Sequence, residues 1–81
     1  MYKIPEKTIK RLILYRRLLL GLKGNGTNKI ISHQLAAMAG VTSAQLHKDL
    51  TPTRYYGSPV HGYDVKQLMG IISEIIDALK M

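Results

Sequence analysis

The sequence lacks three residue types and is poor in acids. It contains no cysteine, phenylalanine or tryptophan, and only five Asp and Glu residues. Leucine, isoleucine and tyrosine must therefore build the core without disulfide bonds, and the absence of cysteine fits a reducing compartment. No stretch approaches the roughly 20 consecutive apolar residues that a membrane span needs, and the N-terminus leads into a charged helix without a signal segment. We therefore expect a cytoplasmic protein that does not insert into a membrane.

Size and charge indicate one small basic domain. At 81 residues the chain has room for a single core, and we expect one domain over residues 1–81. Hydrophobic residues make up 46% of the sequence, which excludes a disordered chain. Twelve Lys and Arg residues against five acids give a net charge of +7. The expected partner is therefore a polyanion, with nucleic acid first and an anionic membrane surface second.

Turn signals separate four helical segments. The first helix is expected to begin near Pro5, whose fixed φ suits a first helical turn, and to end in the glycine-rich stretch 21–26. That stretch is not a nucleotide-binding motif, because it follows a helix where the motif follows a strand.

Residues 32–50 carry the pattern of a helix-turn-helix. A short helix is expected from an N-cap at Ser32 to a C-terminal glycine at Gly40. A third helix opens at Thr42 with a predicted capping box, in which the Gln45 side chain bonds back to Thr42. The expected buried positions are Leu35, Ala36, Ala39, Val41, Leu46 and Leu50.

The segment after the third helix predicts a small two-stranded β wing. Pro52 is expected to end the third helix or shortly precede its end, because a proline disfavours helical conformations at the residue before it. The tyrosines and glycines of residues 53–63 favour one strand near 54–56 and another near 60–63, joined by a turn at 57–59. The predicted fold class is a mainly α winged helix-turn-helix.

The last segment predicts an amphipathic helix with a face for a partner. It starts at Asp64, where a second capping box with Gln67 is expected. Its apolar arc is broader than a small core needs, and Leu14 and Leu18 of the first helix lie within a basic face. We therefore expect a homodimer that uses the last helix together with these two leucines. The arc consists of Val65, Leu68, Met69, Ile71, Ile72, Ile75, Ile76 and Leu79.

Three groups of residues resemble the N-terminal DNA-binding domain of the Rex redox-sensing repressors. The central group is Leu35-Ala36-x-x-x-Gly40-Val41-x-x-x-Gln45-x-x-Lys48-Asp49-Leu50. The resemblance continues through Tyr56-Gly57 to Gly62-Tyr63-Asp64-Val65 and reaches back to Ile4-Pro5-x-x-Thr8-x-x-Arg11-Leu12-x-Leu14-Tyr15. The combination of Lys48-Asp49-Leu50 with Gly62-Tyr63 is the most specific part.

The resemblance implies a winged helix that binds palindromic operators as a homodimer. In that family a second, Rossmann domain senses NADH and releases the DNA, so an NAD(H)-sensing domain is implied to be separate from this chain or removed from it. The sequence departs from the family at His47, where arginine is usual. It also departs in the wing, where Thr53, Arg54, Ser58, Pro59 and Val60 replace a pattern richer in glycine and basic residues.

Eight residues are candidates for contact with DNA. On the third helix, opposite Leu46 and Leu50, they are Ser43, Ala44, His47, Lys48 and Thr51. Arg54 and His61 flank the wing and are candidates for the minor groove or the backbone, and Arg11 is a candidate for a phosphate contact. Each of these is alternatively a solvated surface residue. Asp49 is expected to orient a neighbouring basic residue or to cap locally, because phosphate repels a carboxylate.

Catalysis and metal binding have little support in the sequence. His33, His47 and His61 are dispersed and lack the close spacing of metal ligands. No nucleophile, base and orienting group come together. No Gly-x-Gly-x-x-Gly follows a predicted strand, so no cofactor is expected, and neither NAD nor NADH is expected to bind.

Three functions remain open at this point. The first is transcriptional regulation by a dimer that reads a specific sequence in double-stranded DNA. The second is a protein-interaction module that keeps the fold with an altered DNA face, which His47 and the changed wing favour. The third is non-specific nucleic-acid binding driven by the net charge of +7.

Overall fold

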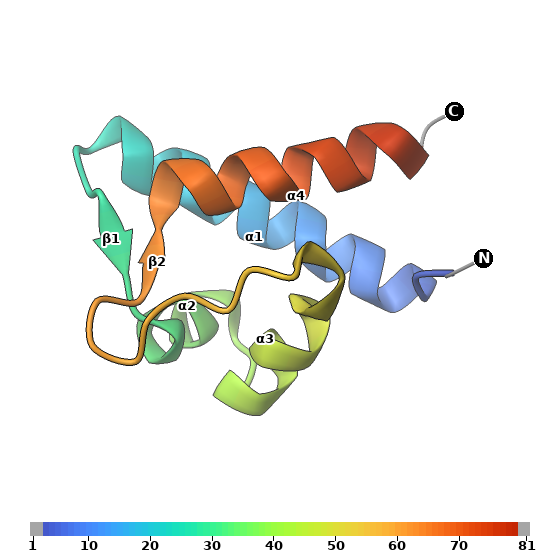
Figure 1. The fold of residues 1–81 in the computed structure, drawn as a ribbon, viewed down its shortest axis with the longest axis horizontal. Coiled ribbons are helices and arrows are strands. Elements are labelled where there is room, and N and C mark those ends of the chain that lie inside the picture. The colour runs from blue at the N-terminus through green and yellow to red at the C-terminus, as the bar shows by residue number, and fades with distance from the viewer. Residues whose placement is uncertain (1–2, 80–81) are drawn as a thin grey trace.

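The first and last helices lie side by side and run in opposite directions (Figure 1). The computed structural model describes residues 3–79, as α1 (Glu6–Gly24), β1 (Lys29–Ile30), α2 (Ser32–Ala39), α3 (Ser43–Asp49), the 3₁₀ helix η1 (Thr51–Thr53), β2 (Tyr63–Asp64) and α4 (Val65–Leu79). Helices α2 and α3 lie together on one side of the α1–α4 pair (Figure 1). The expected mainly α fold with one small sheet is confirmed. No helix within residues 3–79 is long and apolar enough to cross a membrane.

One apolar cluster joins the helices and the sheet. Helix α1 contributes Leu12, Tyr15 and Leu19, whose spacing of three and four residues places them on one face. Full burial of a side chain of this size contributes about 1.5–3 kcal/mol. The other members of the cluster are Ile30, Leu35, Ala36, Leu46, Leu50, Tyr63, Val65, Leu68, Ile72 and Ile76. Of the positions expected to be buried in residues 32–50, only Ala39 and Val41 are half-buried at its edge.

The turn between α2 and α3 is fixed by backbone and side-chain caps. Gly40 adopts the left-handed conformation at φ 74°, and the Val41 N–H donates to the Ala36 carbonyl at 3.0 Å, which closes α2 as expected. The Thr42 hydroxyl accepts from the Gln45 backbone N–H at 3.0 Å, as the capping box predicts.

Two details of the caps predicted for α2 and α3 are wrong. The N-cap of α2 is Ile31, and Ser32 is the first helical residue without a side-chain capping bond. The Gln45 side chain does not return to Thr42; its Nε2 donates to Asp49 Oδ1 at 2.8 Å. A capping box would have used the Gln45 side-chain oxygen to accept from the Thr42 backbone N–H, whereas here the Gln45 side chain is held by the charged acceptor Asp49 one turn along the helix.

The sheet is not the one expected in the wing. Strand β1 pairs antiparallel with β2, with Lys29 opposite Asp64 and Ile30 opposite Tyr63. Within residues 3–79 the predicted strands at 54–56 and 60–63 do not pair with each other, and the wing has only an isolated bridge between Ser58 and Gly62. The residues before this bridge follow η1 and Arg54, whose left-handed conformation at φ 56° turns the chain away from an extended path.

Residues 55–62, here called the wing loop, form a tight turn tied at its base. The Ser58 and Gly62 backbones exchange two hydrogen bonds of 2.8 and 2.7 Å, and the Ser58 hydroxyl oxygen accepts from the N–H groups of Val60 and His61. The backbone N–H of Asp64 donates to the Tyr55 hydroxyl at 2.9 Å, which ties the start of the loop to β2. The loop is therefore ordered by its own bonds and not by a strand ladder.

Helix α4 begins with half of the predicted capping box, because the Asp64 backbone N–H donates to the Tyr55 hydroxyl and, within the described residues, not to the Gln67 side chain. Asp64 Oδ1 accepts from the Gln67 backbone N–H at 2.8 Å, which is the expected N-cap bond. Four residues of the predicted apolar arc are buried, namely Val65, Leu68, Ile72 and Ile76. Leu79 at the end of the helix keeps 46% of its surface exposed.

Gly62 and Gly70 provide a matched test of this fold. Gly62 has φ +72°, and a Cβ there would collide with the carbonyl of Ile30, whereas a Cβ on Gly70 of α4 would meet nothing within 4 Å. We predict that Gly62→Ala lowers the free energy of unfolding by more than about 1 kcal/mol and that Gly70→Ala raises it by up to about 1 kcal/mol. Urea denaturation of both variants measures the difference, and equal effects would contradict the β1–β2 contact.

Candidate nucleic-acid interface

Helix α3 has a buried side and an exposed side. Leu46, Asp49 and the following Leu50 are buried. The exposed positions are Ala44, His47 and Lys48, and Ser43 is half-buried at the first turn. Thr51, expected on this helix, is exposed but lies in η1, because α3 ends at Asp49. The division expected from the sequence is therefore present, and it leaves a polar, basic surface that a partner can approach.

A buried carboxylate holds the inner side of α3 on α1. Asp49 has no exposed surface, and it accepts from Arg11 Nε at 2.6 Å and from Arg11 Nη2 at 3.0 Å. The Tyr15 hydroxyl donates to the same carboxylate at 2.6 Å, and Gln45 Nε2 completes the set. The basic residue that Asp49 orients is thus 38 positions earlier in the sequence.

This network satisfies every buried polar group it contains. No buried side-chain nitrogen or oxygen within the described residues lacks a hydrogen-bond partner. Burial, helped by the bond to Asp49, raises the pKa of the Tyr15 hydroxyl well above its ordinary value of 10.0, so Tyr15 remains a donor. The bond to Asp49 likewise raises the pKa of Arg11. The four side chains form one fixed charge-assisted cluster.

An open groove runs between α3 and the wing loop. Its volume is about 360 Å³, and its lining residues are His47, Lys48, Leu50, Thr51, Tyr55, Tyr56 and Tyr63. Two of the lining residues, Tyr55 and Tyr63, form an edge-to-face pair with ring centroids 5.5 Å apart. Tyr56 keeps 71% of its surface exposed and stands free on the wing side. Three of the candidates expected on the third helix, His47, Lys48 and Thr51, thus line the same groove as the wing loop.

The other candidates lie on different parts of the surface. Arg54 lines a separate hollow with Ile4, Thr51, Pro52 and Ile75, on the side where α1 begins. His61 is exposed in the wing loop. Arg11 already donates from two of its nitrogens to Asp49 and keeps 29% of its side-chain surface exposed, so it is not the free cation expected for a phosphate contact.

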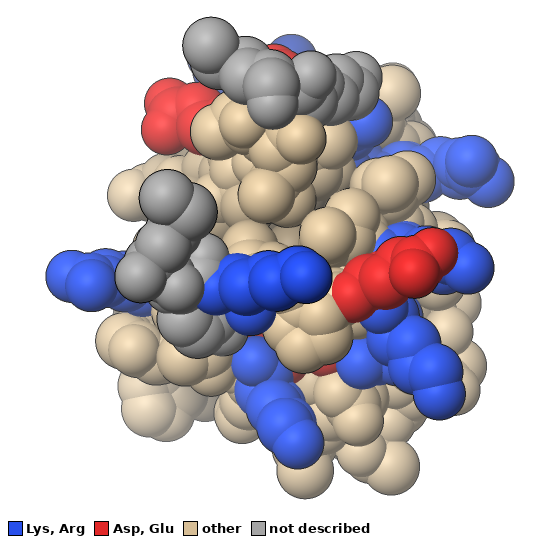
Figure 2. All heavy atoms as spheres, turned by 90° about the vertical axis from the view of Figure 1, so that its right-hand side faces the viewer, with Lys and Arg blue, Asp and Glu red and all other residues tan. Residues whose placement is uncertain are grey.

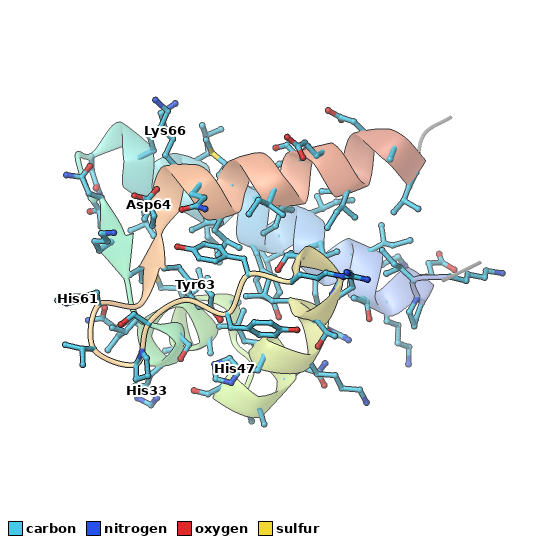
Figure 3. All side chains as sticks on the ribbon, in the orientation of Figure 1. His33, His47, His61, Tyr63, Asp64 and Lys66 are labelled. Carbon is cyan, nitrogen blue, oxygen red and sulfur yellow. The ribbon has the colours of Figure 1, made fainter. Side chains whose placement is uncertain are left out.

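The histidines come from three elements. His33 of α2, His47 of α3 and His61 of the wing loop lie on the same side of the molecule, and Lys66 lies on the opposite side (Figure 3). Within residues 3–79 no group of three or more His, Asp and Glu side chains is arranged to hold a metal ion. The side that carries α3 therefore offers hydrogen-bonding groups but no metal centre in the described part of the chain.

The apolar surface of α1 differs from the expectation. Leu14 and Leu18 are half-buried, and Leu18 packs against the core. The exposed apolar residues of α1 are Ile13 at 36% and Leu20 at 58%. With Arg16, Arg17, Met69 and Ser73 they line an open groove of about 480 Å³ between α1 and α4.

A double-mutant cycle tests how strongly Arg11 and Asp49 are coupled. We predict a coupling energy near 2 kcal/mol for Arg11→Ala with Asp49→Ala, within the 0.5–3 kcal/mol range of residues in direct contact. The control is the exposed pair Glu6–Lys10 at 3.8 Å, for which less than about 0.5 kcal/mol is expected because solvent screens it. Urea denaturation of the parent and the six variants measures both cycles, and equal coupling would refute a special role for Asp49.

Sequence comparison relates the chain to bacterial repressors. Residues 3–51 match the family model described as "Putative DNA-binding protein N-terminus". The redox-sensing transcriptional repressor Rex of Syntrophomonas wolfei is 41% identical over 76 residues, which cover 94% of this chain and 36% of the repressor. Rex of Streptomyces coelicolor is 46% identical over 70 residues, which cover 86% of this chain and 27% of the repressor. The chain thus spans about a third of the length of these relatives.

Solved structures agree with the sequence relatives. The crystal structure of RSP in complex with β-NAD+ and operator DNA superposes with a TM-score of 0.84 at 30% identity, over 94% of this chain and 35% of that chain. A second structure, of RSP described as a Rex-family repressor, gives a TM-score of 0.80. The chain therefore belongs to the family described as "Putative DNA-binding protein N-terminus", which is the N-terminal region of the Rex redox-sensing repressors. Its fold is the winged helix of those repressors.

Proposed function

We propose that this domain binds double-stranded DNA and regulates transcription, with α3 as the recognition helix in the major groove. The observation that carries the proposal is the two-sided α3, which Asp49 fixes from within while Ala44, His47 and Lys48 remain exposed. The major groove of B-DNA admits one α-helix. The related RSP structure contains operator DNA, which supports the same partner class here.

On the exposed side of α3, short side chains precede long ones, an order that suits the approach of a helix to the major groove. Ser43 and Ala44 at the first turn allow close approach, and the Ala44 methyl is suited to the methyl group of thymine. His47 and Lys48 lie one turn further on, where His47 is proposed for a base edge and Lys48 for a phosphate. Thr51, whose hydroxyl donates to the His47 carbonyl at 3.2 Å, borders the same surface.

The wing side supplies the second contact. The exposed Tyr56 lines the groove beside α3, and His61 is exposed in the same wing loop. Both are proposed for contact with DNA on this side, whereas Arg54, which precedes the wing loop, is proposed for the DNA backbone. Arg11 is left out of the proposed set because its bonds to Asp49 hold it within the domain. We further propose that the domain catalyses no reaction and acts in the cytoplasm.

A salt titration separates this function from its rivals. The protein is titrated with a random duplex and with a duplex selected from a random pool, at several salt concentrations. Sequence-specific regulation predicts a large affinity ratio between the two duplexes, and non-specific binding predicts only a steep salt dependence. No binding to either duplex would refute the proposal and favour the protein-interaction module.

Alanine variants of neighbouring residues test the assignment of α3. Lys48→Ala is expected to weaken all duplexes alike and to lower the salt slope by about one unit. His47→Ala is expected to cost roughly 1–3 kcal/mol on the selected duplex and to relax preference at one base pair. Alanine preserves the helix, and circular dichroism checks that both variants fold. Binding like that of the parent in both variants would remove α3 from the interface.

We also propose that the domain forms a homodimer through the α1–α4 side. A twofold dimer would present two α3 helices to half-sites one helical turn apart, about 34–36 Å. The α1–α4 pair lies opposite α3 in Figure 1, so a dimer on that side leaves α3 free. The exposed Ile13 and Leu20 and the groove that they line support this surface.

One exposed leucine tests the dimer. Leu20→Asp is expected to convert a dimer into a monomer at micromolar concentration, because it places a charge among the apolar side chains of the groove. Met38→Asp, on an α2 residue of similar exposure at 47%, is expected to leave the dimer intact. Sedimentation velocity measures both variants, and a parent protein that is already a monomer would refute the proposal.

A further inference from the structure

Cations are distributed unequally on the two sides of α3. The wing loop, residues 55–62, contains no Lys, Arg, Asp or Glu. On the other side, the start of α1 and the segment before it carry Lys3, Lys7 and Lys10 against a single acid, Glu6. Figure 2, which faces the side where α1 begins, shows Lys and Arg side chains spread over it with few acidic ones.

The Arg11–Asp49 pair brings this basic segment to the end of α3. Arg11 reaches Asp49 with two bonds, so the first turns of α1 lie against the last turn of α3. Lys7 precedes Arg11 by one helical turn and lies on the same side of α1. The buried Ile4 lines a hollow with Thr51, Pro52 and Arg54, which places the chain before α1 beside η1.

We propose that the phosphate-contacting edge of this domain is formed by Lys3, Lys7 and Lys10 at and before the start of α1, together with Arg54 at the end of η1, and that the wing makes an uncharged contact. This inference rests on the proposed binding of duplex DNA and names the part of the surface that supplies its electrostatic energy. We call these four residues the α1 edge.

The exposed lysines of the α1 edge are suited to phosphate. Lys3 and Lys7 are exposed, and within the described residues neither forms a salt bridge. Lys10 pairs with Glu6 at 3.8 Å across an exposed helix face, a contact that solvent screens and that phosphate can replace. The charge of Arg11 is neutralised by Asp49. The lysines are therefore the cations of this edge that can bind phosphate. Each phosphate that a cation neutralises releases counterions and steepens the salt dependence by about 0.9.

The wing is built for a different contact. Val60 at its tip keeps 77% of its surface exposed, beside the exposed Pro59. The Ser58–Gly62 bonds and the Ser58 hydroxyl hold the tip rigid, so little conformational entropy is lost when it meets a surface. Apolar side chains contact DNA in the minor groove without releasing counterions. The contribution of the wing to binding is therefore independent of salt.

The test compares salt slopes of matched charge variants of the whole chain on one duplex. Lys7→Ala is expected to lower the slope of log K against log salt by about 0.9. The ratio of its Kd to the parent Kd then narrows roughly 3.5-fold between 50 and 200 mM salt. Lys66→Ala, the same charge change on the opposite side of the molecule (Figure 3), is expected to leave the slope unchanged.

Wing variants complete the experiment. Val60→Ala is expected to weaken binding equally at all salt concentrations, whereas Val60→Lys is expected to steepen the slope because it creates a cation where the wing has none. Thermal melts confirm folding of all variants. Two results would overturn the inference without contradicting DNA binding: equal changes in the salt slope for Lys7→Ala and Lys66→Ala, or a lower salt slope for Val60→Ala. A parent chain that binds no duplex would overturn both.

Discussion

A single buried carboxylate determines how α3 sits on this domain. Asp49 lies on the inner side of the helix and is bonded to α1 through Arg11 and Tyr15, and to its own helix through Gln45. Leu46 and Leu50 supply the apolar burial beside it, but apolar contacts tolerate sliding and rotation. The bidentate bond from Arg11 does not, because the guanidinium and the carboxylate must lie in nearly one plane. The rotation of α3 about its axis, and with it the direction of His47 and Lys48, depends on this geometry.

Such an arrangement is favourable only when it is complete. A carboxylate removed from water loses several kcal/mol of hydration, which must be recovered from hydrogen bonds of good geometry. Asp49 has four of them, and the pKa of Tyr15 is raised so that its hydroxyl keeps its proton and donates. The network therefore contributes more to the orientation of α3 than to the stability of the domain. It also explains why a basic chain holds one of its few acids in the centre.

The features that the sequence predicted correctly arise from contacts between close neighbours in the chain. The cap of α3 at Thr42, the left-handed Gly40 and the cap at Asp64 each involve residues within five positions. The β1–β2 pair is not predicted from the sequence, because Ile30 and Tyr63 are far apart along the chain and local sequence patterns give no information on such pairing.

The candidate DNA interface was also predicted only where it depends on residues close together in the sequence. The exposed side of α3 follows from helical periodicity, and the structure agrees with it. Arg11 was expected to be free because its partner lies 38 positions away. The apolar residues of α1 surround the whole helix, so that periodicity alone chose Leu14 and Leu18 as the outer ones where the structure exposes Ile13 and Leu20.

The pairing of β1 with β2 has a consequence for the order in which the domain can form. Helix α1 and the helix-turn-helix are formed by bonds between residues close in sequence, so they can form early in folding. Ile30 and Tyr63 are far apart in the sequence, and a long loop must close before their backbones can pair. Tyr63 also lines the groove at α3. A nascent chain that has completed α3 thus has a recognition helix but no finished groove, and the surface becomes whole only when β2 arrives and α4 closes over α1.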